Sequence, residues 1–179
     1  MAETLYTLAR EAAALAGGET VYDLYCGTGT IGLALAADAG SVWGVEISEE
    51  SVACAIENAG ANGIGNAQFF AGNVGQSLEE LAERAGSPDV VVVDPPRAGL
   101  AGKALRRTGA LGAERIVYVS CNPTTLASDL AVLRDEYGYE LVRCTPVDMF
   151  PHTPHIESVS LLRRANGSAE EHDAGVTGG

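Results

Sequence analysis

The chain has 179 residues, of which 46% are hydrophobic and 20% are charged, and 24 acidic against 11 basic residues give it a formal net charge of -13. This length predicts one domain with a substantial core, and the apolar content excludes a disordered chain. No apolar run approaches the roughly 20 residues of a membrane-spanning helix, and the acidic start carries no targeting signal, so we expect a cytoplasmic protein. The acidity argues against a chain that binds a phosphate backbone by itself.

Short apolar segments alternate with amphipathic ones along the chain. Helical spacing from Leu5 to Leu15 predicts a first helix that stops at Gly17 and Gly18. β-Branched and aromatic runs then predict five strands, at residues 21–25, 41–45, 67–70, 89–93 and 115–119. Helical patterns follow them, at residues 29–37, 49–62, 76–85, 102–111 and 124–137. Several strands are apolar on both faces, which is typical of parallel strands covered by helices on each side.

Two further strand candidates, at residues 139–145 and 158–163, follow the fifth unit, and the loop between them is too short for a crossover helix. They are predicted to pair antiparallel at the sheet edge. The expected fold class is α/β, a doubly wound, Rossmann-like sheet of five parallel strands plus this edge pair. We expect one domain over residues 1–164 and a disordered tail over residues 165–179, where Gly, Ala and acidic residues show no periodicity.

A glycine-rich loop follows the first predicted strand and opens a helix. Gly27, Gly29 and Gly32 allow the backbone to approach a ligand closely, and Glu46, which ends the second strand, can hold a ribose diol. Asp23 lies just before the loop, with no lysine or arginine near it. This favours a ligand of cationic character, such as S-adenosylmethionine, over a pyrophosphate. A purely structural glycine turn and an NAD site are the alternatives.

The tetrapeptide Asp94-Pro95-Pro96-Arg97 ends the fourth predicted strand. The carboxyl ends of the strands in a doubly wound sheet form the ligand crevice, so we expect Asp94 to project toward cofactor and substrate. The two prolines end the strand sharply because neither can donate to the ladder. A rigid turn with a solvated aspartate is the alternative.

The four cysteines lie far apart and contain no C-x-x-C pair, which argues against a zinc site and against a disulfide framework. Cys121 ends the fifth strand and precedes a predicted helix, whose N-terminal partial positive charge favours a thiolate. It is the candidate nucleophile. Cys26 lies within the glycine loop, and Cys54 and Cys144 are expected to be small buried residues in a helix and an edge strand.

Two histidines, two prolines and a glutamate lie close together in the loop before the last strand. His152 and His155 are spaced by three in a loop that contains proline, which is not a helical ligand face, so we predict no metal site there. Glu157 is a candidate general base. The alternative for Glu157 is a strand-end acid that faces water.

Together these residues resemble the RNA uracil-5-methyltransferase family, whose members use S-adenosylmethionine to make 5-methyluridine in transfer or ribosomal RNA. The resemblance extends from the first helix to Arg164. It rests on five motifs in a fixed order, with Glu157 after the last: Asp23-Leu24-Tyr25-Cys26-Gly27-Thr28-Gly29, Gly44-Val45-Glu46, Asp94-Pro95-Pro96-Arg97-Ala98-Gly99, Tyr118-Val119-Ser120-Cys121-Asn122-Pro123 and Asp148-Met149-Phe150-Pro151-His152-Thr153.

The resemblance implies a class I methyltransferase domain in which Cys121 is the nucleophile and Glu157 is the base. Thiolate attack at uracil C6 makes C5 nucleophilic toward the sulfonium methyl group, and Glu157 then removes the C5 proton. Asp94 and Arg97 are expected to position the substrate. The family positions for the cofactor, S-adenosyl-L-methionine, correspond here to Tyr25, Thr30, Glu46, Asn73 and Asp94.

Family members also carry, upstream of the first helix, a Phe-Gln segment that contacts the cofactor, a central domain and usually an OB-like RNA-binding domain. We expect this chain to be the catalytic domain alone, with most phosphate binding assigned to those other domains. Arg97, Arg106 and Arg107 then offer the local basic contacts. We expect a monomer whose partner is tRNA or rRNA, and neither DNA nor a membrane. A cofactor-binding module without activity and an NAD-dependent oxidoreductase are the alternative functions.

Overall fold

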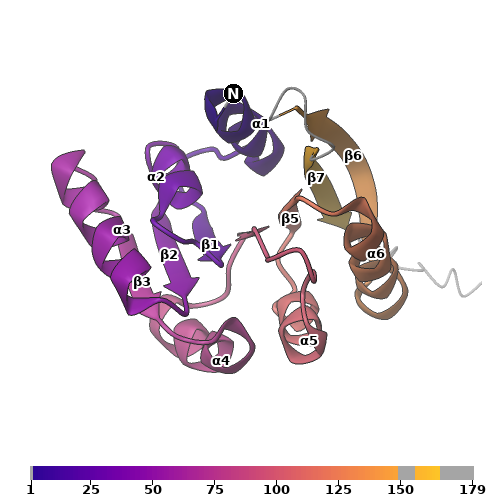
Figure 1. Cartoon of the computed structure of the whole chain (residues 1–179). Coiled ribbons are helices and arrows are strands. Elements are labelled where there is room, and N and C mark those ends of the chain that lie inside the picture. The colour runs from indigo at the N-terminus through magenta and orange to yellow at the C-terminus, as the bar shows by residue number, and fades with distance from the viewer. Residues whose placement is uncertain (1, 149–155, 166–179) are drawn as a thin grey trace, which may run out of the picture.

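The computed structural model describes residues 2–148 and 156–165. Within them, the strands form one sheet in the order β3-β2-β1-β4-β5-β7-β6 (Figure 1). The strands are β1 (Thr20–Leu24), β2 (Ser41–Glu46), β3 (Ala67–Ala71), β4 (Val90–Val93), β5 (Arg115–Ser120), β6 (Tyr139–Val147) and β7 (Glu157–Arg164). The helices are α1 (Ala2–Ala13), α2 (Thr30–Ala36), α3 (Glu49–Ala61), α4 (Val74–Ala85), α5 (Gly102–Ala110) and α6 (Pro123–Tyr137).

Strands β1 to β5 run parallel, and β7 runs antiparallel to both of its neighbours, β5 and β6. The predicted fold class is therefore confirmed. The sequence pattern does not say which strand of the edge pair lies inside. β7 takes the inner place: its residues Ser160, Leu161 and Leu162 are buried, whereas residues 140–144 of β6 are exposed.

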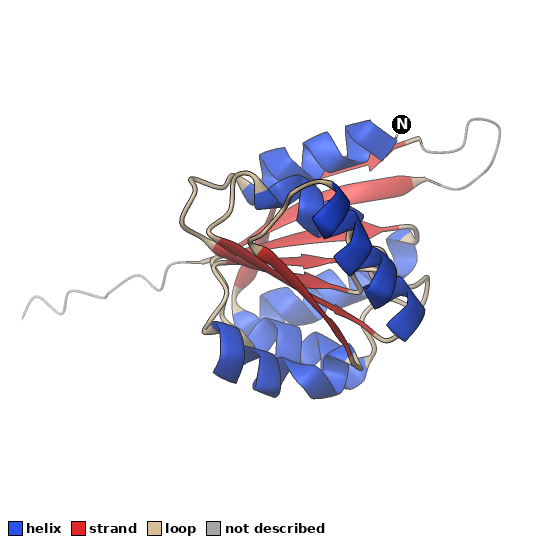
Figure 2. Ribbon diagram, turned by 90° about the vertical axis from the view of Figure 1, so that its left-hand side faces the viewer, coloured by secondary structure: helices blue, strands red, loops and turns tan. Residues whose placement is uncertain are grey.

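Helices cover both faces of the sheet (Figure 2). α4, α5 and α6 contribute to the core on one face, and α1, α2 and α3 lie on the other. Strand β4 shows why both faces need a cover, because Val91 and Val93 pack into the first core while Val90 and Val92 pack into the second. In the part of the chain that the structure describes, no helix combines the length and apolarity that crossing a bilayer requires.

The first helix ends two residues earlier than the spacing of its apolar residues predicts. It stops at Ala13, and Ala14 has a positive φ of 47°. The backbone N–H groups of Ala16, Gly17 and Gly18 then donate to the carboxylate of Glu19, at 2.9 to 3.1 Å. The chain thus turns sharply into β1 around a single side chain.

The parallel strands end at one edge of the sheet, which is where a doubly wound fold binds its ligands. Because β7 is antiparallel, it begins at this same edge instead of ending there. The edge therefore gathers residues from the ends of β1 to β5, or the segments after them, and from the start of β7: Tyr25, Glu46, Asn73, Asp94, Cys121 and Glu157. Residues 149–155, which include the predicted histidine-proline loop, lie outside the described residues, as does the predicted tail from residue 166 onward.

Candidate active site

The glycine loop between β1 and α2 has a backbone shape that few residues other than glycine adopt. Gly27 and Gly29 have φ values of 54° and 79°, both in the left-handed region. Glu46 fixes the loop, since its Oε2 accepts a hydrogen bond from the Gly27 N–H at 3.1 Å and its Oε1 accepts one from the Ser48 N–H at 3.0 Å. The acid that the sequence assigns to a ribose diol therefore also joins the loop to the end of β2.

Asp23 lies beneath this loop and is 1% exposed. Its Oδ2 accepts a hydrogen bond from the Gly32 N–H at 2.9 Å, and its Oδ1 is buried without a hydrogen-bond partner. A Cβ at position 32 would lie 2.6 Å from Oδ2, so the close approach requires glycine. Burial raises the pKa of Asp23 to about 7, with a smaller contribution from the carboxylates of Asp94 and Glu46.

A raised pKa means that folded Asp23 holds its proton more tightly than the unfolded chain does. The free energy of unfolding should therefore fall as the pH rises between about 4 and 7, where the unfolded carboxyl ionises first. We expect Asp23→Asn to remove this dependence. Its stability relative to the parent chain should increase by about 2–4 kcal/mol between pH 4 and pH 8, as measured by urea unfolding. A difference that stays constant or shrinks over this range would contradict the assignment.

Tyr25 joins β1 to the loop in a conformation that is uncommon for a residue with a side chain. Its φ is 62°, and its ring packs against the core on the α4 to α6 face. Burial raises its pKa, as do the carboxylates of Asp129 and Glu46. Packing therefore holds the backbone of Tyr25 in a strained shape at the predicted cofactor position.

The other two predicted cofactor residues begin helices at the same edge. Thr30 is the first residue of α2, is exposed, and lines a surface hollow with Tyr6 and Asn58. Asn73 is the N-cap of α4 and is exposed, and its side chain makes no cap hydrogen bond. Its amide is therefore not committed to capping its own helix.

Asp94 and Glu157 lie close enough to interact electrostatically. Asp94 continues the ladder by one bond, from its N–H to the Leu24 carbonyl at 3.2 Å. Although its surface is reachable by solvent, the surrounding protein desolvates the carboxyl group and, together with the charge of Glu157, raises its pKa to about 6. Two acids that are 63 residues apart in the sequence thus meet at one site.

Cys121 is brought to Glu157 by the antiparallel pairing of β5 with β7. The last pair in this register is Ser120 with Ser158. Cys121 follows Ser120 and Glu157 precedes Ser158, so both residues flank the same end of this strand pair. Cys121 is partly exposed, with the first turn of α6 beginning two residues later. A parallel neighbour for β5 would instead have carried this glutamate to the opposite edge of the sheet.

The segment that carries Arg97 is tied to the start of α6 by two side chains. Asn122 Nδ2 and Thr125 Oγ1 both donate to the carbonyl oxygen of Arg97, at 3.0 and 3.2 Å. Asn122 also caps α6 by accepting from the Thr124 N–H at 3.0 Å. The sequence motifs predict no role for Asn122 and Thr125, although an asparagine before a proline at a helix start is a recognisable capping signal.

Asp129, for which the sequence motifs also predict no role, forms a third tie one turn further along α6. It is 7% exposed, and its Oδ2 accepts from the Leu100 N–H at 2.7 Å and from the Tyr118 hydroxyl at 2.6 Å. A Cβ at Gly99 would lie 2.7 Å from the same oxygen. The loop after β4 and the segment after β5 that carries Cys121 are therefore joined through α6.

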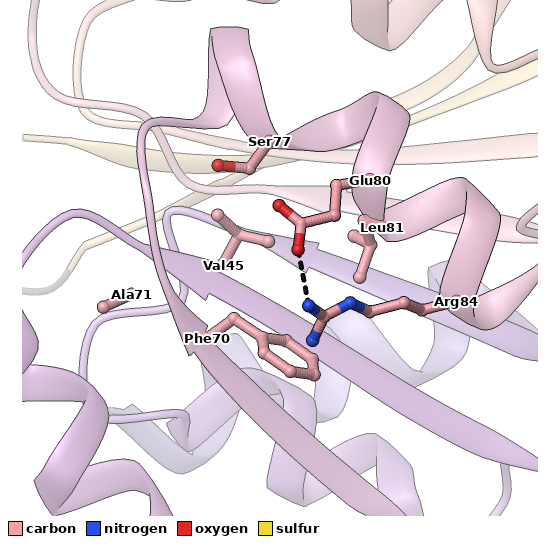
Figure 3. Close-up of a pocket in the computed structure, with 7 residues that line it drawn as sticks. All are labelled: Val45, Phe70, Ala71, Ser77, Glu80, Leu81 and Arg84. Atoms are coloured by element: carbon pink, nitrogen blue, oxygen red, sulfur yellow. Dashed lines mark hydrogen bonds and ion pairs between the residues drawn. The ribbon is translucent and has the colours of Figure 1, made fainter.

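A separate surface pocket lies between β3 and α4, and none of the predicted site residues lines it (Figure 3). Arg84 pairs with Glu80 across it, with the guanidinium 5.5 Å from the centre of the Phe70 ring. Phe70 in turn stacks on Trp43, with ring centres 5.8 Å apart. Arg84 is thus paired with an acid of its own helix, and no predicted site residue is among those that line the pocket.

The other three cysteines differ from one another in burial. Cys26 is buried, and this burial raises the pKa of its thiol, with a further contribution from the carboxylates of Asp23 and Glu46. The expectation that Cys54 is buried is not met, since it lies partly exposed in α3. The expectation that Cys144 is buried is wrong, since it is exposed: it lies on the outermost strand, β6, which no further strand covers.

Within residues 2–148 and 156–165, no group of three or more potential metal-ligating side chains comes together. His152 and His155, for which the sequence predicts no metal role, lie outside the described residues.

The sequence matches the family described as tRNA (uracil-5-)-methyltransferase over residues 1–165. The chain belongs to this family. It is 54% identical, over 163 residues, to an uncharacterized RNA methyltransferase of Enterococcus faecalis, and 48% identical, over 164 residues, to one of Caldanaerobacter subterraneus. These matches cover 91% and 92% of this chain but 35% and 36% of the relatives, so the chain spans about a third of their length.

A solved structure agrees with this assignment. The tRNA (uracil-54, C5)-methyltransferase of Pyrococcus abyssi, determined in complex with S-adenosyl-L-homocysteine, superposes with a TM-score of 0.73 at 36% sequence identity. The similarity covers 87% of this chain and 37% of that one. The resemblance noted from the motifs is therefore confirmed at the level of family and fold.

Proposed function

We propose that the chain is the catalytic domain, over residues 1–164, of an enzyme that transfers a methyl group from S-adenosylmethionine to C5 of uracil in RNA. The observation that carries this proposal is the β5–β7 register, which puts Cys121 and Glu157 at the same end of one strand pair. A C5 methyl transfer through a covalent adduct needs both a nucleophile and a separate base. The match to the tRNA (uracil-5-)-methyltransferase family supports the same reaction.

The residues around the glycine loop fit S-adenosylmethionine. Asp23 offers a buried oxygen without a partner, and a Cβ at Gly27 would meet nothing within 4 Å, so there is open space beside the loop. The clustered acids Asp23, Glu46 and Asp94 suit a cationic ligand better than a pyrophosphate. When bound, the cofactor supplies an electrophilic methyl group on a sulfonium. Tyr25, Gly29, Thr30 and Asn73 complete the proposed binding set.

In the proposed reaction, Cys121 makes the first attack on the uracil ring. Its thiolate adds to C6 of uracil, which turns C5 into a nucleophile able to accept a methyl group. Cys121 lies two residues before Pro123, the first residue of α6, so the segment that carries it leads directly into that helix. The ties from Asn122 and Thr125 to Arg97 keep this segment fixed against the loop that holds the substrate.

Glu157 completes the reaction. After methylation, C5 carries both the methyl group and a proton, and the Glu157 carboxylate removes that proton. The electrons of the C5–H bond then form the C5–C6 double bond, the bond from C6 to the Cys121 sulfur breaks, and the thiolate is released. We assign Asp94, whose pKa is raised to about 6, to positioning the uracil ring together with Arg97, and not to proton transfer.

RNA, from the tRNA or rRNA class, is the proposed substrate, and the target uracil must leave its stack to reach Cys121. A non-catalytic cofactor-binding module shares the loop geometry but has no use for the Cys121 and Glu157 arrangement. An NAD-dependent oxidoreductase has no support from the family match.

The experiment that tests the proposal combines the chain with methyl-labelled S-adenosylmethionine and a uridine-containing RNA. We expect label at C5 of uracil, detected after nuclease digestion and chromatography, and tight binding of S-adenosylmethionine by calorimetry with no competition from NAD. Binding of the cofactor without methylation of any RNA would favour the non-catalytic module. Displacement of S-adenosylmethionine by NAD would overturn the cofactor assignment.

A further inference from the structure

Two basic residues in the first turns of α5, Lys103 and Arg106, have no carboxylate partner among the residues the structure describes, and both are exposed. Most other described cations are paired with acids: Arg10, Arg84, Arg107, Arg115, Arg134 and Arg143. The chain has a net charge of -13, and these two unpaired cations lie about one turn apart on the same helix. We call Lys103 and Arg106 the cationic face of α5.

The cationic face lies at the carboxyl edge of the sheet, beside the proposed active site. α5 starts directly after the loop that runs from Asp94, and that loop is tied to α6 through Leu100 and Asp129. The first turns of α4 and α5 also touch, since a Cβ at Gly75 would lie 3.3 Å from the Ala104 backbone N. The cationic face is thus anchored to the segments that carry the proposed cofactor and substrate residues.

No acidic side chain offsets the positive end of α5. The first turn of α5 has no acidic residue, and its N-cap, Ala101, makes no side-chain cap bond. The guanidinium of Arg106 reaches back toward Gly102, where its Nη2 lies 4.0 Å from the position of a Cβ. Two side-chain cations therefore add to the positive end of the helix, an arrangement that an anion would relieve.

We propose that the cationic face binds the phosphate backbone of the substrate RNA next to the extruded uracil. This inference rests on the proposed function and adds a docking surface to it. Charge complementarity favours an RNA strand as the partner, because its backbone presents a series of phosphates that two neighbouring cations can contact together. The chain as a whole has 24 acidic against 11 basic residues, and this excess of acids disfavours an RNA backbone on much of the remaining surface.

The test compares Lys103→Gln/Arg106→Gln with a matched control, Arg163→Gln. Arg163 is also exposed and without a carboxylate partner among the described residues, but lies near the opposite end of the sheet. Binding of a fluorescent uridine-containing RNA is measured over about 50–200 mM salt. We expect the double variant to bind about tenfold more weakly and its salt slope to fall by about 1.4, which is 0.7 for each lost single-strand phosphate contact. Arg163→Gln should match the parent chain.

Several outcomes overturn the proposal. The first two are an unchanged RNA affinity and salt slope in the double variant, and a loss of RNA affinity in Arg163→Gln as large as that in the double variant. The other two are absence of RNA binding by the parent chain, and displacement of the fluorescent RNA by inorganic phosphate as effective as its displacement by unlabelled RNA. Calorimetry with S-adenosylmethionine checks that the double variant is folded and binds cofactor normally. A chain that forms a covalent adduct with 5-fluorouracil RNA through Cys121, yet shows any of these outcomes, retains the proposed function and loses only the docking surface. A chain that forms no adduct loses the proposed function instead.

Discussion

Replacing Cys121 by alanine should abolish methylation of uracil and all covalent trapping of 5-fluorouracil RNA. The fluorine at C5 cannot leave as a proton does, so the parent chain should be caught as a protein–RNA adduct that survives denaturing electrophoresis. Without the thiolate, C5 has no route to become a nucleophile, and we expect methyl transfer to fall at least about a thousandfold. Binding of S-adenosylmethionine, measured by calorimetry, should persist, because Cys121 follows β5 and is not part of the glycine loop.

Cys144→Ala is the matched control for this experiment. Cys144 is the exposed cysteine on β6, and its replacement should leave adduct formation and turnover unchanged. Adduct formation by Cys121→Ala at the rate of the parent chain would refute the assignment of the nucleophile. Loss of the adduct in Cys144→Ala but not in Cys121→Ala would move the covalent step to the edge strand.

Replacing Glu157 by glutamine should separate the two halves of the reaction. Thiolate attack and methyl transfer do not need the base, whereas release of the product does. An adduct with ordinary uracil RNA should therefore accumulate in the presence of S-adenosylmethionine, and turnover should fall by about 10²–10⁴-fold. The measurement is a time course of adduct by denaturing electrophoresis beside the release of methylated RNA.

Glu140→Gln provides the control, since Glu140 is an exposed acid on β6, and it should behave as the parent chain does. Undiminished release of methylated RNA by Glu157→Gln would show that another group takes the proton. Asp94, whose pKa is raised by burial and by the charge of Glu157, would then be the next acid to replace.

Local signals were enough to place the secondary structure. The valine run of β4, the glycines after β1 and the prolines after Asp94 each act over a few residues, so their effects can be predicted without knowledge of the rest of the chain. The end of α1 differs from its predicted position because Glu19, beyond the helix, binds three backbone N–H groups of the turn. The burial of Cys144 was wrong for a different reason: a strand pattern does not reveal whether the strand will be the outermost one.

The sequence by itself determined that this protein is an α/β domain with a glycine loop, an acid after the fourth strand and a cysteine at the end of the fifth, because turn chemistry and hydrophobic period are local properties. Only the tertiary structure decided that β7 inserts between β5 and β6 and so brings Glu157 beside Cys121. It also decided which side chains of α6 tie the two loops together, and which cations find no acid. Those outcomes depend on groups distant in sequence, whose pairing is fixed by strand order and by competition for buried space.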